Sequence, residues 1–198
     1  FGNEILQKQF ETSSLKGFGI DDLSYAVCAA GAALHYLSDT QHNKTKHITS
    51  VSRIEEDKYV WLDRFTIRNL ELIYSPNENA KTLIDVLDHT ISPMGSRLLK
   101  RWVALPLKDI QPINNRLDAV HQFVGNEELS TKVAANINEV GDLERLISKV
   151  ATARINPREV VQLKRALTVI EPIKALCAGS NNDSLKKIGE RLNPCELI

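Results

Sequence analysis

The side chains of this 198-residue chain that could do chemistry are mostly basic. Arg97, Lys100 and Arg101 cluster just before Trp102, and the stretch 142–165 carries six basic residues against three acidic ones. The basic residues of that stretch are Arg145, Lys149, Arg154, Arg158, Lys164 and Arg165, and the acidic ones are Asp142, Glu144 and Glu159. Such strips are typical either of contacts with DNA phosphates or of solvated helix faces with internal ion pairs, and we favour the second interpretation. Arg97, Lys100 and Arg101 stay candidates for contact with a DNA backbone.

A second polar cluster is Arg68-Asn69-Leu70-Glu71, which follows closely on Asp63. Its guanidinium, amide and carboxylate groups have a high capacity for hydrogen bonds. The cluster contains no nucleophile and no plausible general base, so we interpret it as structural. The residues that we expect to hold elements together or to couple them are Asp63, Arg68, Asn69, Glu71, Asp142, Glu144, Arg145 and Arg158.

Motifs that would signal catalysis or cofactor binding are absent from the sequence. It has no G-x-x-x-x-G-K-[ST] phosphate loop, no G-x-G-x-x-G, no H-E-x-x-H and no G-x-S-x-G. The three cysteines are far apart and form no C-x-x-C zinc pair. The sequence therefore predicts no catalytic, cofactor-binding or metal site in this chain.

The composition is that of an ordinary globular protein, with a hydrophobic fraction of 42% and a formal net charge of zero. A zero net charge means that no overall field draws the chain onto nucleic acid. No apolar run is long enough to cross a membrane. An odd, sparse cysteine count is typical of a reducing compartment, so we expect a cytoplasmic protein. Cys28 lies among alanines on a helix, which predicts a small buried side chain.

The elements that must position these residues are mainly helical. Helical periodicity covers 1–11 and, after an expected cap at Asp21, residues 23–37. Residues 38–47 are polar and indicate a linker. The β-prone runs 48–54 and 59–62 predict a hairpin.

Helices dominate again after the predicted hairpin. Asp63, Ser92 before Pro93, Asp109 and Asn156 before Pro157 are each expected to cap a helix. We expect Ile113, Leu117, Val120 and Val124 to line the buried face of one helix, and Val160, Leu163, Leu167 and Ile170 that of another. Pro172 should break or kink the latter. The predicted fold class is mainly α, with one small β element.

Several segments resemble the MutS family of DNA mismatch-repair proteins. Residues 29–37 with Asp39-Thr40-Gln41 resemble the closing helix of its connector domain. Six further segments resemble successive parts of its core domain: Leu62-Asp63 with 66–72, then 82–88, 93–102, 105–107, 141–146 and Pro157-Arg158-Glu159. The likeness runs from about residue 1 to residue 176. It predicts that 1–42 ends an α/β connector domain and that 43–198 begins a helical core domain, truncated at its carboxyl end.

The resemblance implies a division of labour within a longer parent protein. The parent would be a DNA-dependent ATPase that uses ATP and Mg²⁺, binds mismatched double-stranded DNA, works with a MutL-type repair partner and forms a homodimer. Its mismatch-reading Phe-x-Glu motif and its phosphate loop are both absent here. This chain would be the non-catalytic part that links the DNA-gripping and clamp domains to the ATPase domain.

Two other interpretations stay open. The chain could be a self-sufficient helical DNA-binding domain, in which a helix presents basic residues with Asn or Gln to the major groove. Gln162 between Arg158 and Arg165 is the nearest approach to that pattern. An enzyme with an unrecognised site is the least favoured interpretation, because no nucleophile–base pair is visible.

Overall fold

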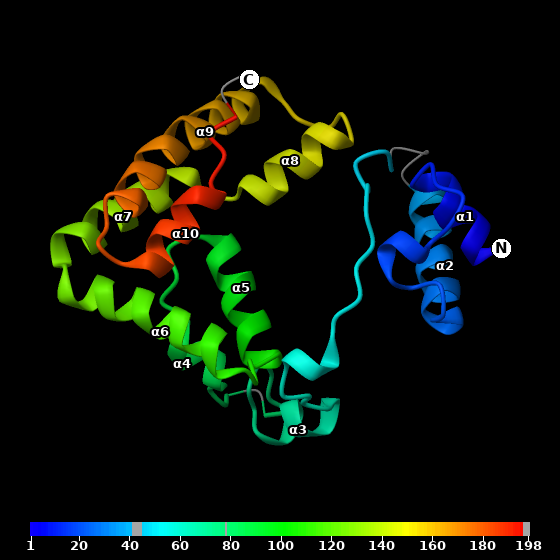
Figure 1. Cartoon of the computed structure of the whole chain (residues 1–198), viewed down its shortest axis with the longest axis horizontal. Coiled ribbons are helices and arrows are strands. Elements are labelled where there is room, and N and C mark those ends of the chain that lie inside the picture. The colour runs from blue at the N-terminus through cyan, green and yellow to red at the C-terminus, as the bar shows by residue number, and fades with distance from the viewer. Residues whose placement is uncertain (41–44, 78, 196–198) are drawn as a thin grey trace. The chain divides into compact units, whose positions relative to one another are not determined.

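A computed structural model describes residues 1–40, 45–77 and 79–195 of the chain (Figure 1). The chain divides into two compact units. The first comprises residues 1–55 with 146–156, and the second 56–145 with 157–198. The domain boundary predicted at 42/43 lies outside the described residues.

The first unit is built on two helices that pack closely, α1 (Gly2–Gln9) and α2 (Ser24–Thr40), with the 3₁₀ turn η1 (Lys16–Phe18) between them. Its core consists of Leu6, Leu15, Ile20, Val27 and Leu34. The amide of Gln9 donates to the carbonyls of Thr45 at 2.7 Å and of Ile48 at 2.9 Å. This side chain therefore fixes the chain that follows α2 against the end of α1.

Glycine allows the close approach of α1 and α2. A Cβ atom added to Gly31 would lie 2.4 Å from the Cα atom of Gly2, far inside van der Waals contact. The predicted burial of Cys28 is wrong, because α2 turns Val27, Gly31 and Leu34 toward the core and leaves Cys28 exposed. Asp21 does not cap α2, which begins three residues later at Ser24.

The second unit is a set of helices. Their bounds are α3 (Arg64–Asn69), α4 (Leu83–Leu87), α5 (Pro93–Ala104), α6 (Ile110–Gly125), α7 (Glu127–Val140), α8 (Leu143–Ala151), α9 (Pro157–Ala178) and α10 (Asp183–Arg191), preceded by the 3₁₀ turn η2 (Glu56–Lys58). The second half of α8 belongs to the first unit by the division given above. The long helix α9 packs along α7 on one side and against α10 on another (Figure 1).

Two of the predicted caps are confirmed in full. The Asp63 carboxylate accepts a hydrogen bond from Thr66 N at 2.6 Å and begins α3. Ser92 Oγ accepts one from Gly95 N at 3.2 Å, and Pro93 is the first residue of α5. These groups satisfy backbone N–H donors that a helix start would otherwise leave unpaired.

The predicted β-hairpin is not found, since the described residues contain no strand. Residues 48–54 have no regular structure, and η2 occupies the place of the expected turn. Tyr59 instead forms an isolated antiparallel bridge with Leu107, supported by a 2.8 Å bond from Val60 N to Pro106 O. The β-prone run 59–62 therefore pairs with the segment after α5 rather than with the run that precedes it in sequence.

The predicted buried face of α6 is wrong, and that of α9 is only half-buried at Leu163, Leu167 and Ile170. Leu117, Val120 and Val124 of α6 are 58%, 57% and 79% exposed in the described structure. The buried residues of α9 are Ala166, Val169 and Cys177, whereas Val160 is half exposed. Helical periodicity locates an apolar stripe on a helix, but it does not predict whether another helix packs against that stripe.

Pro172 does not end α9, which continues to Ala178. The proline lies on the exposed side of the helix, while Val169 and Cys177 on either side of it are buried. Packing against α7 and α10 thus holds the helix together despite the backbone hydrogen bond that a proline removes.

The contact between α1 and α2 can be tested by replacing Gly31 with alanine. Because the added methyl group meets backbone atoms of Gly2, we expect a loss of about 1–3 kcal/mol in the first unit, as for other overpacked cores. The control is Gly17→Ala, whose Cβ would meet nothing within 4 Å. Amide hydrogen exchange of α1 and α2 should quicken only in Gly31→Ala; equal protection in both variants would show that the helices separate without cost.

Candidate functional site

A polar network connects helices of the second unit, and we call it the Arg97 bridge: Arg97, Asp142 and Glu144. Arg97 Nη2 donates to Asp142 Oδ1 at 2.7 Å, and its Nη1 donates to Asp142 Oδ2 at 3.1 Å. Its Nε donates to Glu144 Oε2 at 2.9 Å. One planar guanidinium thus holds two carboxylates that lie 45 and 47 residues away in sequence.

Local structure places both carboxylates at the junction of α7 and α8. Gly141 ends α7 with φ 63° and ψ −136°, a conformation that a residue with a Cβ atom rarely adopts. The chain can therefore turn sharply between Val140 and Asp142. Asp142 Oδ1 also accepts a 3.3 Å hydrogen bond from Arg145 N, so the same carboxylate anchors the start of α8.

The bridge lies at the edge of an apolar cluster. Val140, Ala166 and Val169 are its buried members, with Met94, Leu143 and Ile173 packed against them. Met94 is one turn before Arg97 on α5, and Leu143 lies between the two carboxylate residues. The bridge and the cluster together join α5, α7, α8 and α9.

The electrostatics of the bridge favour its charged form. The hydrogen bonds from Arg97 are the main reason why the pKa of Asp142 lies below its ordinary value of 3.8, and the Arg145 N–H lowers this pKa further. In return, hydrogen bonds from Asp142 and Glu144 raise the pKa of Arg97. The Asp142 side chain is 21% exposed and that of Arg97 is 48% exposed, so solvent screens the pair only in part.

The polar cluster around α3 is held together in a different way. Glu71 has a positive φ of 48°, and its carboxylate accepts a 2.8 Å hydrogen bond from Ser75 Oγ. Its carbonyl accepts from Leu83 N at 2.9 Å, which connects α3 to α4. Arg68 and Asn69 lie in the last turn of α3 with exposed side chains.

The remaining basic candidates are not gathered at one place. Lys100 is near enough to Asp85 and Asp88 for its charge to contribute to the lowered pKa of each. Hydrogen bonds from Thr82 are the larger cause of the lowered pKa of Asp85. A hydrogen bond from Ser96 is the largest cause of the lowered pKa of Asp88. Arg101, Arg145 and Arg158 are exposed.

One contact between helices is not predicted from the sequence. The Arg116 guanidinium of α6 lies 3.7 Å from the centre of the Trp102 ring, a cation–π contact between α5 and α6. Burial lowers the pKa of Arg116, which fits a partly covered guanidinium. Trp102 is therefore covered from α6, and the basic residues next to it in sequence are not its partners. No local signal connects residues in separate helices.

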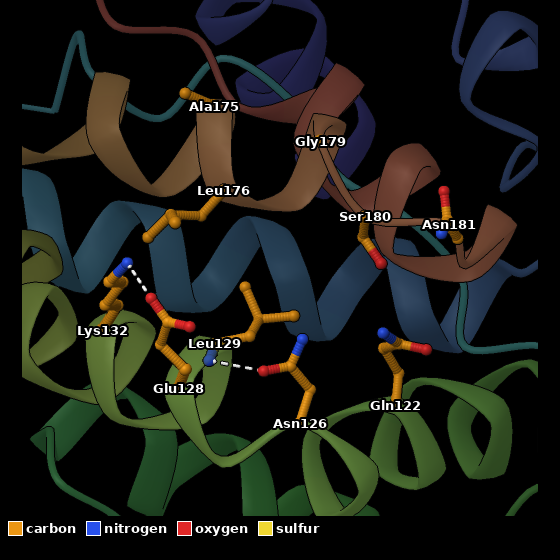
Figure 2. Close-up of a pocket in the computed structure, with 10 residues that line it drawn as sticks. All are labelled: Gln122, Asn126, Glu128, Leu129, Lys132, Ala175, Leu176, Gly179, Ser180 and Asn181. Carbon is orange, nitrogen blue, oxygen red and sulfur yellow. Dashed lines mark hydrogen bonds and ion pairs between the residues drawn. The ribbon is translucent and has the colours of Figure 1, made fainter.

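A polar pocket of about 320 Å³ lies where the α6–α7 corner meets the α9–α10 corner (Figure 2). Asn126 Oδ1 accepts from Leu129 N and caps α7, and Glu128 pairs with Lys132 one turn along. The lining of the pocket thus carries one paired charge of each sign and no nucleophile next to a base. Across the described residues no group of three His, Cys, Asp or Glu side chains could hold a metal ion, and no helix is long and apolar enough to span a membrane.

The bridge can be tested through the pKa of Asp142. Because this pKa is lowered in the folded state, the contribution of Asp142 to stability is present above pH 3.8 and is lost as the pH falls through the lowered value. In Arg97→Gln the pKa should rise toward 3.8, and it should stay low in Arg101→Gln, the control on the same helix. Carboxyl carbon NMR of Asp142 against pH measures this, and an unchanged pKa in Arg97→Gln would rule the bridge out.

Comparison with known proteins identifies the family. Residues 65–197 match the family model MutS domain III, and residues 1–49 match MutS domain II. The DNA mismatch repair protein MutS of Christiangramia forsetii is 54% identical over 198 residues, which is 100% of this chain and 23% of that protein. That of Phocaeicola vulgatus is 56% identical over 195 residues, 98% of this chain and 22% of that protein. The chain thus spans about a quarter of the length of these relatives, and it belongs to the MutS family of DNA mismatch-repair proteins.

Proposed function

We propose that this chain is the non-catalytic coupling segment of a MutS-type mismatch-repair ATPase. It would hold the DNA-gripping domains and the ATPase domain of the parent in a fixed relation and pass conformational change between them. The observation that carries this proposal is the joining of α5, α7, α8 and α9 by the Arg97 bridge and the cluster of Val140, Ala166 and Val169. Packed elements of this kind move together rather than deform.

The long helix α9 is the element best suited to carry a displacement. It has 22 residues, so its length is about 33 Å at 1.5 Å per residue. Its middle is buried against α7, and its second half packs against α10. A movement imposed at one end would therefore reach the other end, and the effect at a distant site is measured as a coupling free energy, typically about 1–3 kcal/mol.

The other properties of the parent belong to the same proposal. ATP and Mg²⁺ would bind outside this segment, and the parent as a whole would bind mismatched DNA, a MutL-type partner and the second copy of a homodimer. We place the end of the connector domain at residue 42 and the protein in the bacterial cytoplasm. The printed name of the relatives, DNA mismatch repair protein MutS, supports the repair role.

The residues of the α3 cluster would serve the same purpose. Asp63 and Glu71 hydrogen-bond to backbone or side chains that order α3 and its connection to α4. Lys100 and Arg101 remain proposed contacts with a DNA backbone. A self-sufficient DNA-binding domain is less well supported, because Arg97, a central cation of the basic strip on α5, is occupied by two carboxylates.

The mechanical role of α9 can be tested in the intact protein. Lys164 and Arg165 are exposed, and glycine at both positions should cost about 1 kcal/mol each in helix propensity with little loss of packing. Mismatch binding and basal ATP turnover should each persist, while the change in ATP turnover on adding mismatched DNA should fall. The double alanine variant is the control, since it removes the same charges but favours the helix.

Three measurements on one preparation separate the outcomes. A loss of coupling in the glycine variant alone supports a role for helix stiffness. An equal loss in the alanine variant would assign the effect to the two charges, and full coupling in both variants would make α9 a mere scaffold. Equal falls in binding and in basal turnover would indicate general destabilisation.

A further inference from the structure

A second recess of the second unit lies beside α3, and the proposed coupling role assigns no ligand to it. We call it the α3 bay. It has a volume of about 420 Å³ and is lined by Arg64, Phe65 and Arg68 of α3 and by Tyr74, Ser75 and Pro76. Its size falls within the range of about 300–1,000 Å³ that is usual for ligand sites.

The bay combines two free cations with apolar walls. Arg64 and Arg68 are one helical turn apart and therefore lie on the same face of α3. Neither guanidinium has an ion-pair partner among the residues that the structure describes. Phe65 is 74% exposed and Tyr74 is 42% exposed. Large apolar side chains that gather on an exposed surface often mark a binding site.

The framework of the bay is held in place before any ligand arrives. Asp63 caps α3, and Ser75 Oγ donates to the Glu71 carboxylate on the opposite side of the turn. Hydrogen bonds from Leu83 N and Ile84 N to the carbonyls of Glu71 and Leu72 fix the turn that leads to Tyr74. The Glu71 carboxylate is thus engaged by Ser75, and within the described part of the chain no carboxylate pairs with either arginine.

We propose that the α3 bay binds a short peptide segment in which a carboxylate side chain stands next to an aromatic or aliphatic one. A guanidinium fork matches a carboxylate in two parallel hydrogen bonds, and two such forks can hold one or two acidic side chains. The rings of Phe65 and Tyr74 and the Pro76 ring then cover the apolar neighbour. Aromatic and Arg side chains around a recess are also the usual anchors of protein interfaces.

A single-stranded nucleic acid fits the bay less well. Such a polyanion needs a row of cations along its backbone, and the bay offers two. The Asp63 carboxylate, whose pKa is lowered by its hydrogen bonds to Thr66, stands immediately before Arg64 and would repel the next phosphate.

NMR titration of the isotope-labelled chain tests the proposal with defined probes. The tripeptide Glu-Phe-Glu, acetylated and amidated at its ends, should give saturable shifts at α3 and at residues 74–76. The uncharged analogue Gln-Phe-Gln should bind at least about tenfold more weakly, the scale expected for a charge-assisted hydrogen bond. Arg64→Gln and Arg68→Gln should each weaken binding of the acidic peptide by about tenfold, whereas Arg191→Gln on α10 should not change it.

The results that would overturn the proposal can be distinguished from one another. Equal binding of the two tripeptides would overturn the charge recognition, and so would binding that neither arginine substitution weakens. A thymidine hexanucleotide that binds more tightly than Glu-Phe-Glu and depends on Arg64 would show a nucleic-acid site instead. Absence of saturable shifts with every probe would show that the bay is not a site. Arg64 is exposed at the first position of α3, so its variant reports even where Arg68→Gln disturbs folding.

Discussion

The arrangement of α5 relative to α7 and α8 in the second unit depends on one guanidinium, that of Arg97. Arg97 on α5 meets Asp142 and Glu144 where α7 gives way to α8, and the carboxylate of Asp142 in turn anchors the start of α8. The contact requires Gly141 to turn the chain at positive φ and requires Ser92 and Pro93 to begin α5 at the right residue. A substitution that shifts either helix end would separate the charges.

Exposed ion pairs contribute little to stability one by one, and Arg97 is nearly half exposed. The apolar cluster of Val140, Ala166 and Val169 supplies the burial that holds α7 against α9. The bridge fixes the relative orientation of the helices, because a planar guanidinium donates hydrogen bonds to two carboxylates in only a few geometries. In the proposed role the cluster makes the helices move as one body, and the bridge sets the angle at which α5 joins them.

Local signals were readable from the sequence, and distant pairings were not. Asp63 and Ser92 act on amides three residues away, so their type and position were enough to predict α3 and α5. Arg97 was instead grouped with Lys100 and Arg101 as a candidate for DNA contact, because its partners lie 45 and 47 residues away. The same limit explains the hairpin that was predicted between neighbouring runs, when Tyr59 in fact bridges to Leu107.

The apolar faces of α6 and α9 show that burial also depends on residues distant in sequence. The stripe of Leu117, Val120 and Val124 is regular, yet it is open to solvent in the described structure, while the smaller Ala166 is almost fully buried. The periodicity of apolar residues is a property of one helix, whereas the burial of those residues depends on which other helices pack against it. The family resemblance rested on short segments in a fixed order, and that order is independent of burial, so it was the more reliable guide.

A double-mutant cycle on the Arg97 bridge tests the central claim most directly. Asp142→Asn keeps the oxygen that accepts from Arg145 N but removes the charge that Arg97 binds. The quantity to measure, in the intact protein, is the ratio of ATP turnover with mismatched DNA to that with fully paired DNA. If the bridge carries the coupling, Arg97→Gln and the double variant will lower this ratio by the same factor, and Asp142→Asn will lower it by no more than that because Glu144 still binds Arg97. Losses that multiply in the double variant, or a ratio that none of the three changes, would contradict the account.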